Sequence, residues 1–187
     1  MNTDFDLPIV TDRLLLRPFE PSDRPAYDAY HSRPDVYRFL YMPVPTGQAL
    51  DAQFLSVLPG RFTEDGDTFR LAVTRKDDAV VLGEVLLKIA NKAALQGEVG
   101  YIFNPDYAGK GYATEAVQAM VDTGFRKCGF HRIFARLDPL NTGSVGVMER
   151  LKFRREAHLI HNDRFEGSWG DEFIYALVRS EWEKIAS

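Results

Sequence analysis

The sequence predicts a single α/β (α+β) domain in which a mixed sheet of about six or seven strands is flanked by about four helices. Three observations lead to this prediction. The chain has 187 residues, which is close to the usual size of one domain. Runs rich in β-branched and aromatic residues are interspersed with segments of helical periodicity. No internal repeat, low-complexity tract or long linker divides the chain.

The predicted strands are short aliphatic and aromatic runs bounded by turn-forming residues. They comprise residues 12–19, 68–75, 79–90, 95–103, 131–138, 153–159 and 171–178. The sequence "KDDA" between the second and third strands predicts a hairpin. Two short helical stretches follow the first strand, with Pro25 and Pro34 at first-turn positions. A further helix is expected to stop at Pro59.

The best-defined predicted helix begins at Ala113. Its small and apolar residues recur at i, i+3, i+4 and i+7, which is the pattern of a helix that buries one face. These residues are Ala116, Val117, Met120, Val121, Gly124, Phe125 and Cys128. Gly129 is well placed to end this helix. A second, short helix is expected after Asn141, whose side chain is a favourable N-cap.

The composition narrows the classes of function. The net charge is −4, with 27 acidic against 23 basic residues, which argues against a protein that coats nucleic acid. The single cysteine, Cys128, cannot form an internal disulfide and fits a reducing compartment. The first residues lack the basic region followed by an apolar stretch that marks a secretory signal. No apolar run approaches the length of a membrane helix. These features predict a cytoplasmic protein that binds neither nucleic acid nor membranes.

The segment "YAGKGYATEA", residues 107–116, follows a predicted strand and opens the best-defined helix. Glycines at a helix N-terminus allow a phosphate to approach backbone N–H groups closely. The letters do not match a nucleoside-triphosphate loop, because no Ser or Thr follows Lys110. They do not match a dinucleotide fingerprint either, because Thr114 stands where its last Gly or Ala belongs. An ordinary strand-to-helix turn is the alternative on these residues alone.

The stretches "VGYIFNPDYAGKGYATEAVQAMVDTGF" and "NTGSVGVMERLKF" resemble the acetyl-CoA site of the GNAT N-acetyltransferase superfamily. Gly111 and Ala113 fill the last two fixed places of that family's loop, while Ala108 stands where Gln or Arg is usual. "GKGYATEA" and the later Asn-x-x-Ser are similar to the RimJ/RimL ribosomal-protein acetyltransferase branch. "TDRLLLRPFEPSD" and "EFIYALVRSEW" resemble that branch's opening and closing strands. The resemblance implies a mostly antiparallel GNAT domain over residues 10–182, with tails at 1–9 and 183–187.

The resemblance also implies a site for acetyl-CoA as co-substrate, without a metal. The pantetheine arm is expected along the backbone of one strand, at Tyr101, Ile102 and Phe103. The pyrophosphate is expected on the N–H groups of the loop and first helical turn, at Gly109, Lys110, Gly111, Tyr112, Ala113 and Thr114. Lys110 is either a point charge for the phosphate or a solvated loop lysine. Asn141 is expected to cap its helix and to bond the pantetheine arm.

Two residues are candidates for proton transfer. An amine must be neutral to attack the acetyl group, and the departing thiolate must be protonated or stabilised. Glu98 is the candidate base, acting directly or through a water, with an exposed or ion-paired strand residue as the alternative reading. Ser144 is the candidate acid, with a first-turn cap as its alternative. The tyrosine that many relatives use lies seven residues after the Asn, and here that position is Met148.

Residues of the acceptor side are less sharply indicated. Tyr41 is expected in one wall of the acceptor groove, although a packing role explains it equally well. Asp163 falls where some relatives place a carboxylate near the amine, with a solvated loop acid as the alternative. His158 and His161 have no partners at metal-ligand spacing, so strand histidines are the simpler interpretation.

The leading hypothesis is an N-acetyltransferase that works by direct attack of the amine in a ternary complex. Its acceptor is a primary amine, either a protein N-terminus or a small molecule. The alternative hypothesis is a non-catalytic acyl-CoA-binding regulatory module. It is motivated by the missing tyrosine, by Ala108, and by Lys152, which stands where the family usually has a glycine before the Phe. The sequence leaves open whether the chain forms a homodimer.

Overall fold

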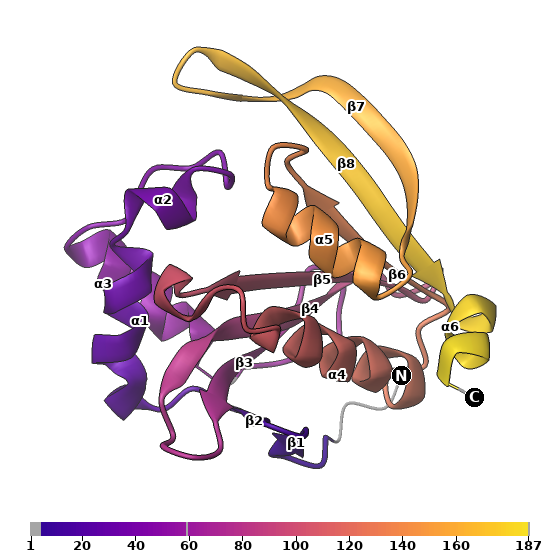
Figure 1. Cartoon of the computed structure of the whole chain (residues 1–187), viewed down its shortest axis with the longest axis horizontal. Coiled ribbons are helices and arrows are strands. Elements are labelled where there is room, and N and C mark those ends of the chain that lie inside the picture. The colour runs from indigo at the N-terminus through magenta and orange to yellow at the C-terminus, as the bar shows by residue number, and fades with distance from the viewer. Residues whose placement is uncertain (1–4, 59, 187) are drawn as a thin grey trace.

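A computed structural model describes residues 5–58 and 60–186 of the chain. Its strands form one eight-stranded sheet in the order β1-β2-β3-β4-β5-β6-β8-β7 (Figure 1). Every neighbouring pair is antiparallel except β5 and β6, which are parallel. The strands are β1 Ile9–Val10, β2 Leu14–Arg17, β3 Thr68–Arg75, β4 Val81–Asn91, β5 Gln96–Phe103, β6 Arg132–Leu137, β7 Arg154–Phe165 and β8 Ser168–Val178.

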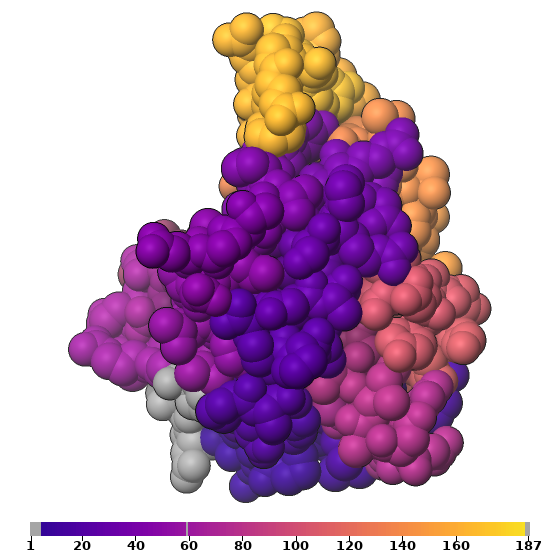
Figure 2. Space-filling model, turned by 90° about the vertical axis from the view of Figure 1, so that its left-hand side faces the viewer, coloured from indigo at the N-terminus to yellow at the C-terminus, as the bar shows by residue number. Residues whose placement is uncertain are grey.

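Helices lie on both faces of this sheet (Figure 1). The α-helices are α1 Arg24–His31, α2 Pro34–Tyr37, α3 Gln48–Val57, α4 Tyr112–Arg126, α5 Thr142–Arg150 and α6 Arg179–Ala186. Two single-turn 3₁₀ helices, η1 Pro21–Asp23 and η2 Pro105–Tyr107, lie before α1 and α4. Helices α1, α2 and α3 gather on one side of the molecule, below the projecting tip of the β7–β8 hairpin (Figure 2).

The predicted fold class is confirmed, but the predicted numbers of strands and helices were too low. The additional strand is β1, which has only two residues and pairs with β2, too short for an alternating pattern to reveal. Helix α6 follows β8 directly, and its sequence was expected to be the end of a strand and a tail. Pro59, the predicted stop of α3, and residues 1–4 and 187 of the predicted tails lie outside the described residues.

The main core lies between the sheet and α4. The predicted apolar face of α4 is buried as a whole, and Cys128 beyond its end is 1% exposed. Gly124 brings the helix close to the sheet, because a Cβ there would lie 2.7 Å from Ile133 Cδ1. The helix ends at Arg126, and Gly129 follows it with the left-handed φ of +74° that glycine tolerates. The helix that the periodicity predicts, α4, is therefore the one whose first turn faces the site described below.

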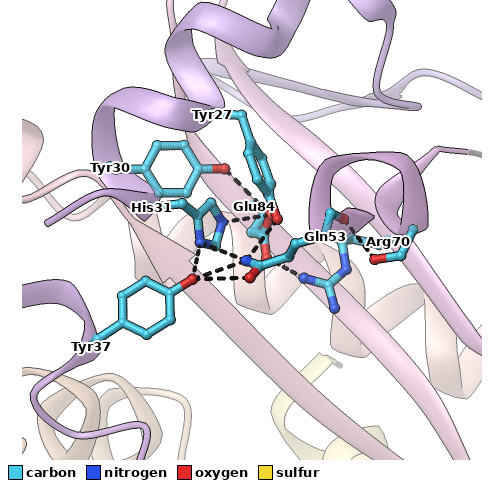
Figure 3. Close-up of polar contacts among 8 residues, drawn as sticks. Tyr27, Tyr30, His31, Tyr37, Gln53, Arg70 and Glu84 are labelled. Carbon is cyan, nitrogen blue, oxygen red and sulfur yellow. Dashed lines mark hydrogen bonds and ion pairs between the residues drawn. The ribbon is translucent and has the colours of Figure 1, made fainter. Parts of the chain in front are cut away.

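A second core lies under α1 and α3, and a buried polar network joins it to the sheet (Figure 3). Glu84 of β4 is fully buried and accepts hydrogen bonds from Arg70 and Tyr30. His31 lies 3.5 Å from the same carboxylate. The other ring nitrogen of His31 lies 2.7 Å from the hydroxyl of Tyr37 and 2.9 Å from Gln53 Nε2. Side chains from α1 and β3 therefore contact one carboxylate of β4, and side chains from α2 and α3 reach it through His31.

Strands β5 and β6 separate after a short region of pairing. Their register covers only Gln96, Gly97 and Glu98 on β5, opposite residues 132–134 of β6. Beyond this point β5 stays paired with β4 as far as Phe103, and β6 stays paired with β8 as far as Leu137. The sheet therefore opens between two strands in its middle, immediately after Glu98.

Candidate active site

A cavity of about 640 Å³ lies beyond the point where β5 and β6 separate. It is formed by the end of β5, the loop before α4, the first turn of α4, one side of α5 along its length, and α2 with the residues after it. Its lining includes nearly all the residues predicted to bind acetyl-CoA: Tyr101, Ile102, Phe103, Gly109, Gly111, Tyr112, Ala113, Thr114 and Asn141. The candidate acid, Ser144, lines it as well. Lys110 is the exception, because it does not line this cavity.

The loop before α4 has a backbone that only glycine adopts readily. Gly109 has a φ of +76° and Gly111, the N-cap of α4, has a φ of +80°. A Cβ at Gly109 would meet no atom within 4 Å, so conformation rather than space explains this glycine. The loop turns the chain so that Tyr112, Ala113 and Thr114 of the first helical turn line the cavity. Free N–H groups at such a turn form an anion site.

The same loop is anchored from behind by Glu115. Its carboxylate accepts hydrogen bonds from Thr11 Oγ1 at 2.6 Å, from the backbone N–H of Arg13 at 2.8 Å and from the Arg13 guanidinium at 2.7 Å. Arg13 also donates to the carbonyl of Lys110 at 2.9 Å. Burial raises the pKa of Glu115, but these bonds outweigh burial and hold it below its usual value. The helical periodicity predicts only that Glu115 faces away from the main core. Its hydrogen bonds to Thr11 and Arg13, in the turn between β1 and β2, could not be predicted from the sequence.

The first turn of α5 forms the opposite side of the cavity. Asn141 Oδ1 accepts a hydrogen bond from the backbone N–H of Ser144 at 3.1 Å, so the predicted cap is confirmed. The hydroxyl of Tyr101 donates to the backbone carbonyl of Ser144 at 3.3 Å. Burial raises the pKa of Tyr101 to about 12, so the phenol stays protonated at neutral pH. Met148, at the position where many relatives have a tyrosine, is fully buried. The phenol that contacts α5 is that of Tyr101 in β5, for which the sequence indicated only a backbone role.

Glu98 lies at the opening between β5 and β6, but its side chain is on the face of the sheet opposite to that of Tyr101. It is the last β5 residue in register with β6, as expected from its place before the separation. Side chains alternate along a strand, so Glu98 and Tyr101 point to opposite faces. Glu98 is paired across the ladder with Lys88, and the two charged groups are 3.8 Å apart. The ion pair that was the alternative interpretation of Glu98 is therefore present. The Glu98 side chain is 23% exposed.

Residues 33–41 cross the opening from one strand to the other. Near its start, Arg33 forms an ion pair of 2.7 Å with Asp106 in η2, after β5. At its end, Tyr41 donates a hydrogen bond of 2.6 Å to Asp138, directly after β6. Between these anchors, Phe39 and Leu40 line the cavity. We call residues 33–41 the strap.

The structure brings the two predicted acceptor residues close together. Asp163 is not in a loop: it belongs to β7 and pairs with Gly170 of β8. Tyr41 packs against Gly170 so closely that a Cβ there would lie 1.9 Å from the tyrosine Oη. Burial and the hydrogen bond to Asp138 raise the pKa of Tyr41, and the charges of Asp163 and Asp171 raise it further. Three carboxylates, those of Asp138, Asp163 and Asp171, therefore lie around the end of the strap.

The two histidines lie on the same hairpin, around Asp171. His158 Nε2 is 2.7 Å from the Asp171 carboxylate, which also accepts a hydrogen bond from the backbone N–H of His161 at 2.9 Å. Nowhere in the described ranges do three His, Cys, Asp or Glu side chains gather as metal ligands would. Over the same residues, every helix is too short or too polar to cross a bilayer.

Comparisons with known proteins agree with this geometry. Residues 13–154 match the family model of the acetyltransferase (GNAT) domain. The uncharacterized N-acetyltransferase YnaD of Bacillus subtilis (strain 168) is 32% identical over 174 residues, which cover 93% of this chain and 98% of YnaD. The [ribosomal protein uS5]-alanine N-acetyltransferase of Escherichia coli (strain K12) is 25% identical over 122 residues, covering 65% of this chain and 63% of that enzyme.

A solved structure gives the same result for the fold. The crystal structure of an acetyltransferase of the GNAT family from Bacillus anthracis superimposes with a TM-score of 0.83 and 31% sequence identity. The superposition covers 92% of this chain and 99% of that one. The similarity therefore extends over nearly the whole length of both proteins.

Proposed function

The chain belongs to the GNAT acetyltransferase family, and we propose that it transfers the acetyl group of acetyl-CoA to a primary amine by direct attack in a ternary complex. One observation carries this proposal. The sheet opens beside Glu98, and the cavity at that opening is lined by Ser144, the glycine loop and the first turn of α4. An opening of this kind gives two reactants access from opposite faces of the sheet.

The residues present fit acetyl-CoA, which supplies the thioester that the amine attacks. Left-handed glycines and free N–H groups at the start of α4 suit a pyrophosphate. The side of β5 that β6 leaves unpaired, at residues 99–103, offers backbone groups to an extended pantetheine arm. In this proposal Gly109, Gly111 and Thr114 hold the phosphates, and Tyr101 to Phe103 hold the arm.

Proton movement is assigned to residues on the two faces. Glu98 takes the proton of the ammonium group at its carboxylate, and its partner Lys88 keeps that carboxylate in place. On the opposite face, the hydroxyl of Ser144 donates its proton to the departing thiolate and regains one from the nitrogen as the amide forms. The hydroxyl of Tyr101, fixed on the carbonyl of Ser144, keeps the first turn of α5 in position. The strap limits the access of water to the opening.

The acceptor is proposed to be a protein N-terminus or a small amine. The relative that acetylates an N-terminal alanine of ribosomal protein uS5 supports the first choice. The carboxylates of Asp138, Asp163 and Asp171 around Tyr41 support any acceptor that arrives as an ammonium ion, because opposite charges steer an encounter. In this proposal Glu98 deprotonates either kind of acceptor.

The first test is a thermal-shift panel with acetyl-CoA, CoA, ATP and NAD. A ligand at a hundred times its Kd adds about 2.7 kcal/mol, which raises the Tm of a domain of this size by roughly 5–10 °C. We expect this rise with acetyl-CoA and CoA alone. A rise with ATP or NAD, or with none of the four, contradicts the proposal.

The second test is turnover. Thiol release is followed with N-terminal peptides and with polyamines as acceptors, and Glu98→Gln is expected to lower kcat about 100-fold without changing the Kd of CoA. Glu64→Gln is the matched control, because Glu64 is exposed and forms a surface ion pair with Lys92 at 3.1 Å. Binding of acetyl-CoA without transfer to any amine would instead favour the non-catalytic, acyl-CoA-binding module.

A further inference from the structure

Arg150, the last residue of α5, lines the cavity and reaches α4. Its Nε–H donates a hydrogen bond to Thr114 Oγ1, in the first turn of α4, at 3.2 Å. Its guanidinium lies over Gly146, one helical turn earlier, where a Cβ would be 3.0 Å from Nη1. The absence of a side chain at Gly146 therefore gives Arg150 room to lie along the helix toward the cavity.

Arg150 is the only positively charged side chain among the described residues that line the cavity. Lys110, the lysine of the glycine loop, stands outside that lining and contributes its carbonyl to Arg13 instead. Other arginines around the opening are committed to carboxylates: Arg13 to Glu115, Arg33 to Asp106 and Arg136 to Glu172. Within the described ranges, no carboxylate forms an ion pair with Arg150.

The loop offers no side-chain donor at Ala108, the place where the resemblance puts Gln or Arg. Ala108 lines the cavity, but its methyl group cannot donate a hydrogen bond. The backbone N–H groups and the helix N-terminus provide roughly half a unit of positive charge. A pyrophosphate carries about two negative charges, so backbone groups alone leave it incompletely neutralised. A guanidinium offers a fork of donors that matches phosphate oxygens.

From this geometry, and on the basis of the proposed function, we propose that Arg150 binds the pyrophosphate of CoA. Arg150 thereby provides the side-chain donor for phosphate that Ala108 cannot provide. The charge comes from α5, on the far side of the opening, rather than from the loop before α4. Its bond to Thr114 holds the guanidinium beside the N–H groups that contact the same phosphates. Binding of CoA therefore links the two helices that face each other across the cavity.

Calorimetric titration of Arg150→Met tests this assignment. We expect the Kd of CoA and of 3′-dephospho-CoA to rise about tenfold, the effect of losing a charge-assisted hydrogen bond. The Kd of pantetheine, which has no phosphate, should not change. Arg150→Lys keeps the charge and should lose less than Arg150→Met. The salt dependence of the Kd of CoA should also become weaker in Arg150→Met, because one charge contact has gone.

Arg126→Met is the matched control, since it removes an arginine from the opposite end of α4, where the side chain lies over the Trp182 ring. It should leave all three Kd values unchanged. A loss of affinity by Arg150→Met for pantetheine as well would indicate a structural role and overturn the assignment. A loss for CoA but not for 3′-dephospho-CoA would place Arg150 at the 3′-phosphate and overturn it too. Failure of the wild-type protein to bind CoA would instead refute the proposed function.

Discussion

Tyr41 and Gly170 are fitted to each other at the end of the strap. Tyr41 itself has a φ of +50°, an uncommon conformation for a residue with a side chain. Its hydroxyl is held by Asp138, and its ring rests where any side chain at position 170 would stand. The glycine therefore fixes the position of the tyrosine, and the tyrosine fixes the end of the strap.

Gly170→Ala is expected to displace Tyr41 and break its hydrogen bond with Asp138. Because this bond is one of the two anchors of the strap, the KM of the acceptor should rise about tenfold, the equivalent of one such bond. The Kd of CoA should change less than this KM, because the phosphate contacts proposed for CoA come from the loop before α4 and from the start of that helix rather than from the strap. Steady-state kinetics and calorimetry measure the two effects. Tyr41→Phe isolates the hydroxyl, and an unchanged KM in both variants contradicts this role of the strap.

Single residues were predictable where their chemistry is local. Asn141 caps α5 because a side-chain oxygen at that position reaches the N–H three residues later, and Gly111 is needed for its φ. Arg150 and the hydroxyl of Tyr101 were not predictable. Their partners, Thr114 and Ser144, are 36 and 43 residues away in the chain, and no local pattern encodes such contacts.

At the scale of elements, the buried network decides how α1, α2 and α3 sit on the sheet. Tyr30 and His31 belong to α1, Tyr37 to α2 and Gln53 to α3, and all of them reach Glu84 directly or through one another (Figure 3). Burial alone would raise the pKa of Glu84. The hydrogen bond with His31 and the charge of Arg70 outweigh burial and lower it. The network therefore holds a carboxylate anion in the interior.

Glu84→Gln should lower the free energy of unfolding by about 3 kcal/mol at pH 7, because it removes the buried charge that pairs with Arg70. The folded-state pKa of Glu84 lies below its unfolded value of about 4.5. Its contribution is therefore fully present above that value and is lost as the pH falls through the folded-state pKa. Urea unfolding at pH 7 and at lower pH should show the difference from wild type shrinking in acid. A pH-independent difference contradicts this account.

Periodicity predicted the long elements and missed those that depend on context. Helix α4 was predictable because its apolar face repeats over several turns. Strand β7 extends to Phe165, well beyond the predicted end at residue 159. Most of its side chains are exposed, so no burial pattern marks it, and its pairing with β8 supplies the order.

At the scale of the whole molecule, the two ends of the described chain pack against the domain. Phe5 stacks on Phe69, with ring centroids 3.9 Å apart. Trp182 of α6 is 7% exposed, stacks on Phe125 at 5.2 Å and donates a hydrogen bond to Asp122 at 2.6 Å. Helix α6 therefore covers the far end of α4, whose first turn faces the candidate site.

Removing the residues after Val178 should destabilise the protein by about 3–5 kcal/mol, the usual effect of losing a buried tryptophan. Removing only those after Trp182, where the predicted domain ends, should cost under about 1 kcal/mol, because residues 183–185 are exposed. Urea unfolding of the two shortened chains measures both values. Equal losses would mean that the stabilising contacts lie beyond Trp182 and that the boundary at residue 182 is wrong.

The separation of β5 and β6 has a consequence for how this protein can change over evolutionary time. In the proposed complex, recognition of the pantetheine arm along residues 99–103 relies on main-chain atoms, which every amino acid except proline supplies in full. Mutations there leave these atoms in place as long as the chain stays extended, although Tyr101 also contributes its hydroxyl to α5. The strap and the β7–β8 hairpin contribute side chains instead, on separate elements. A lineage can therefore exchange one amine for another by altering these segments alone, while the half of the protein that handles the acetyl donor is inherited intact.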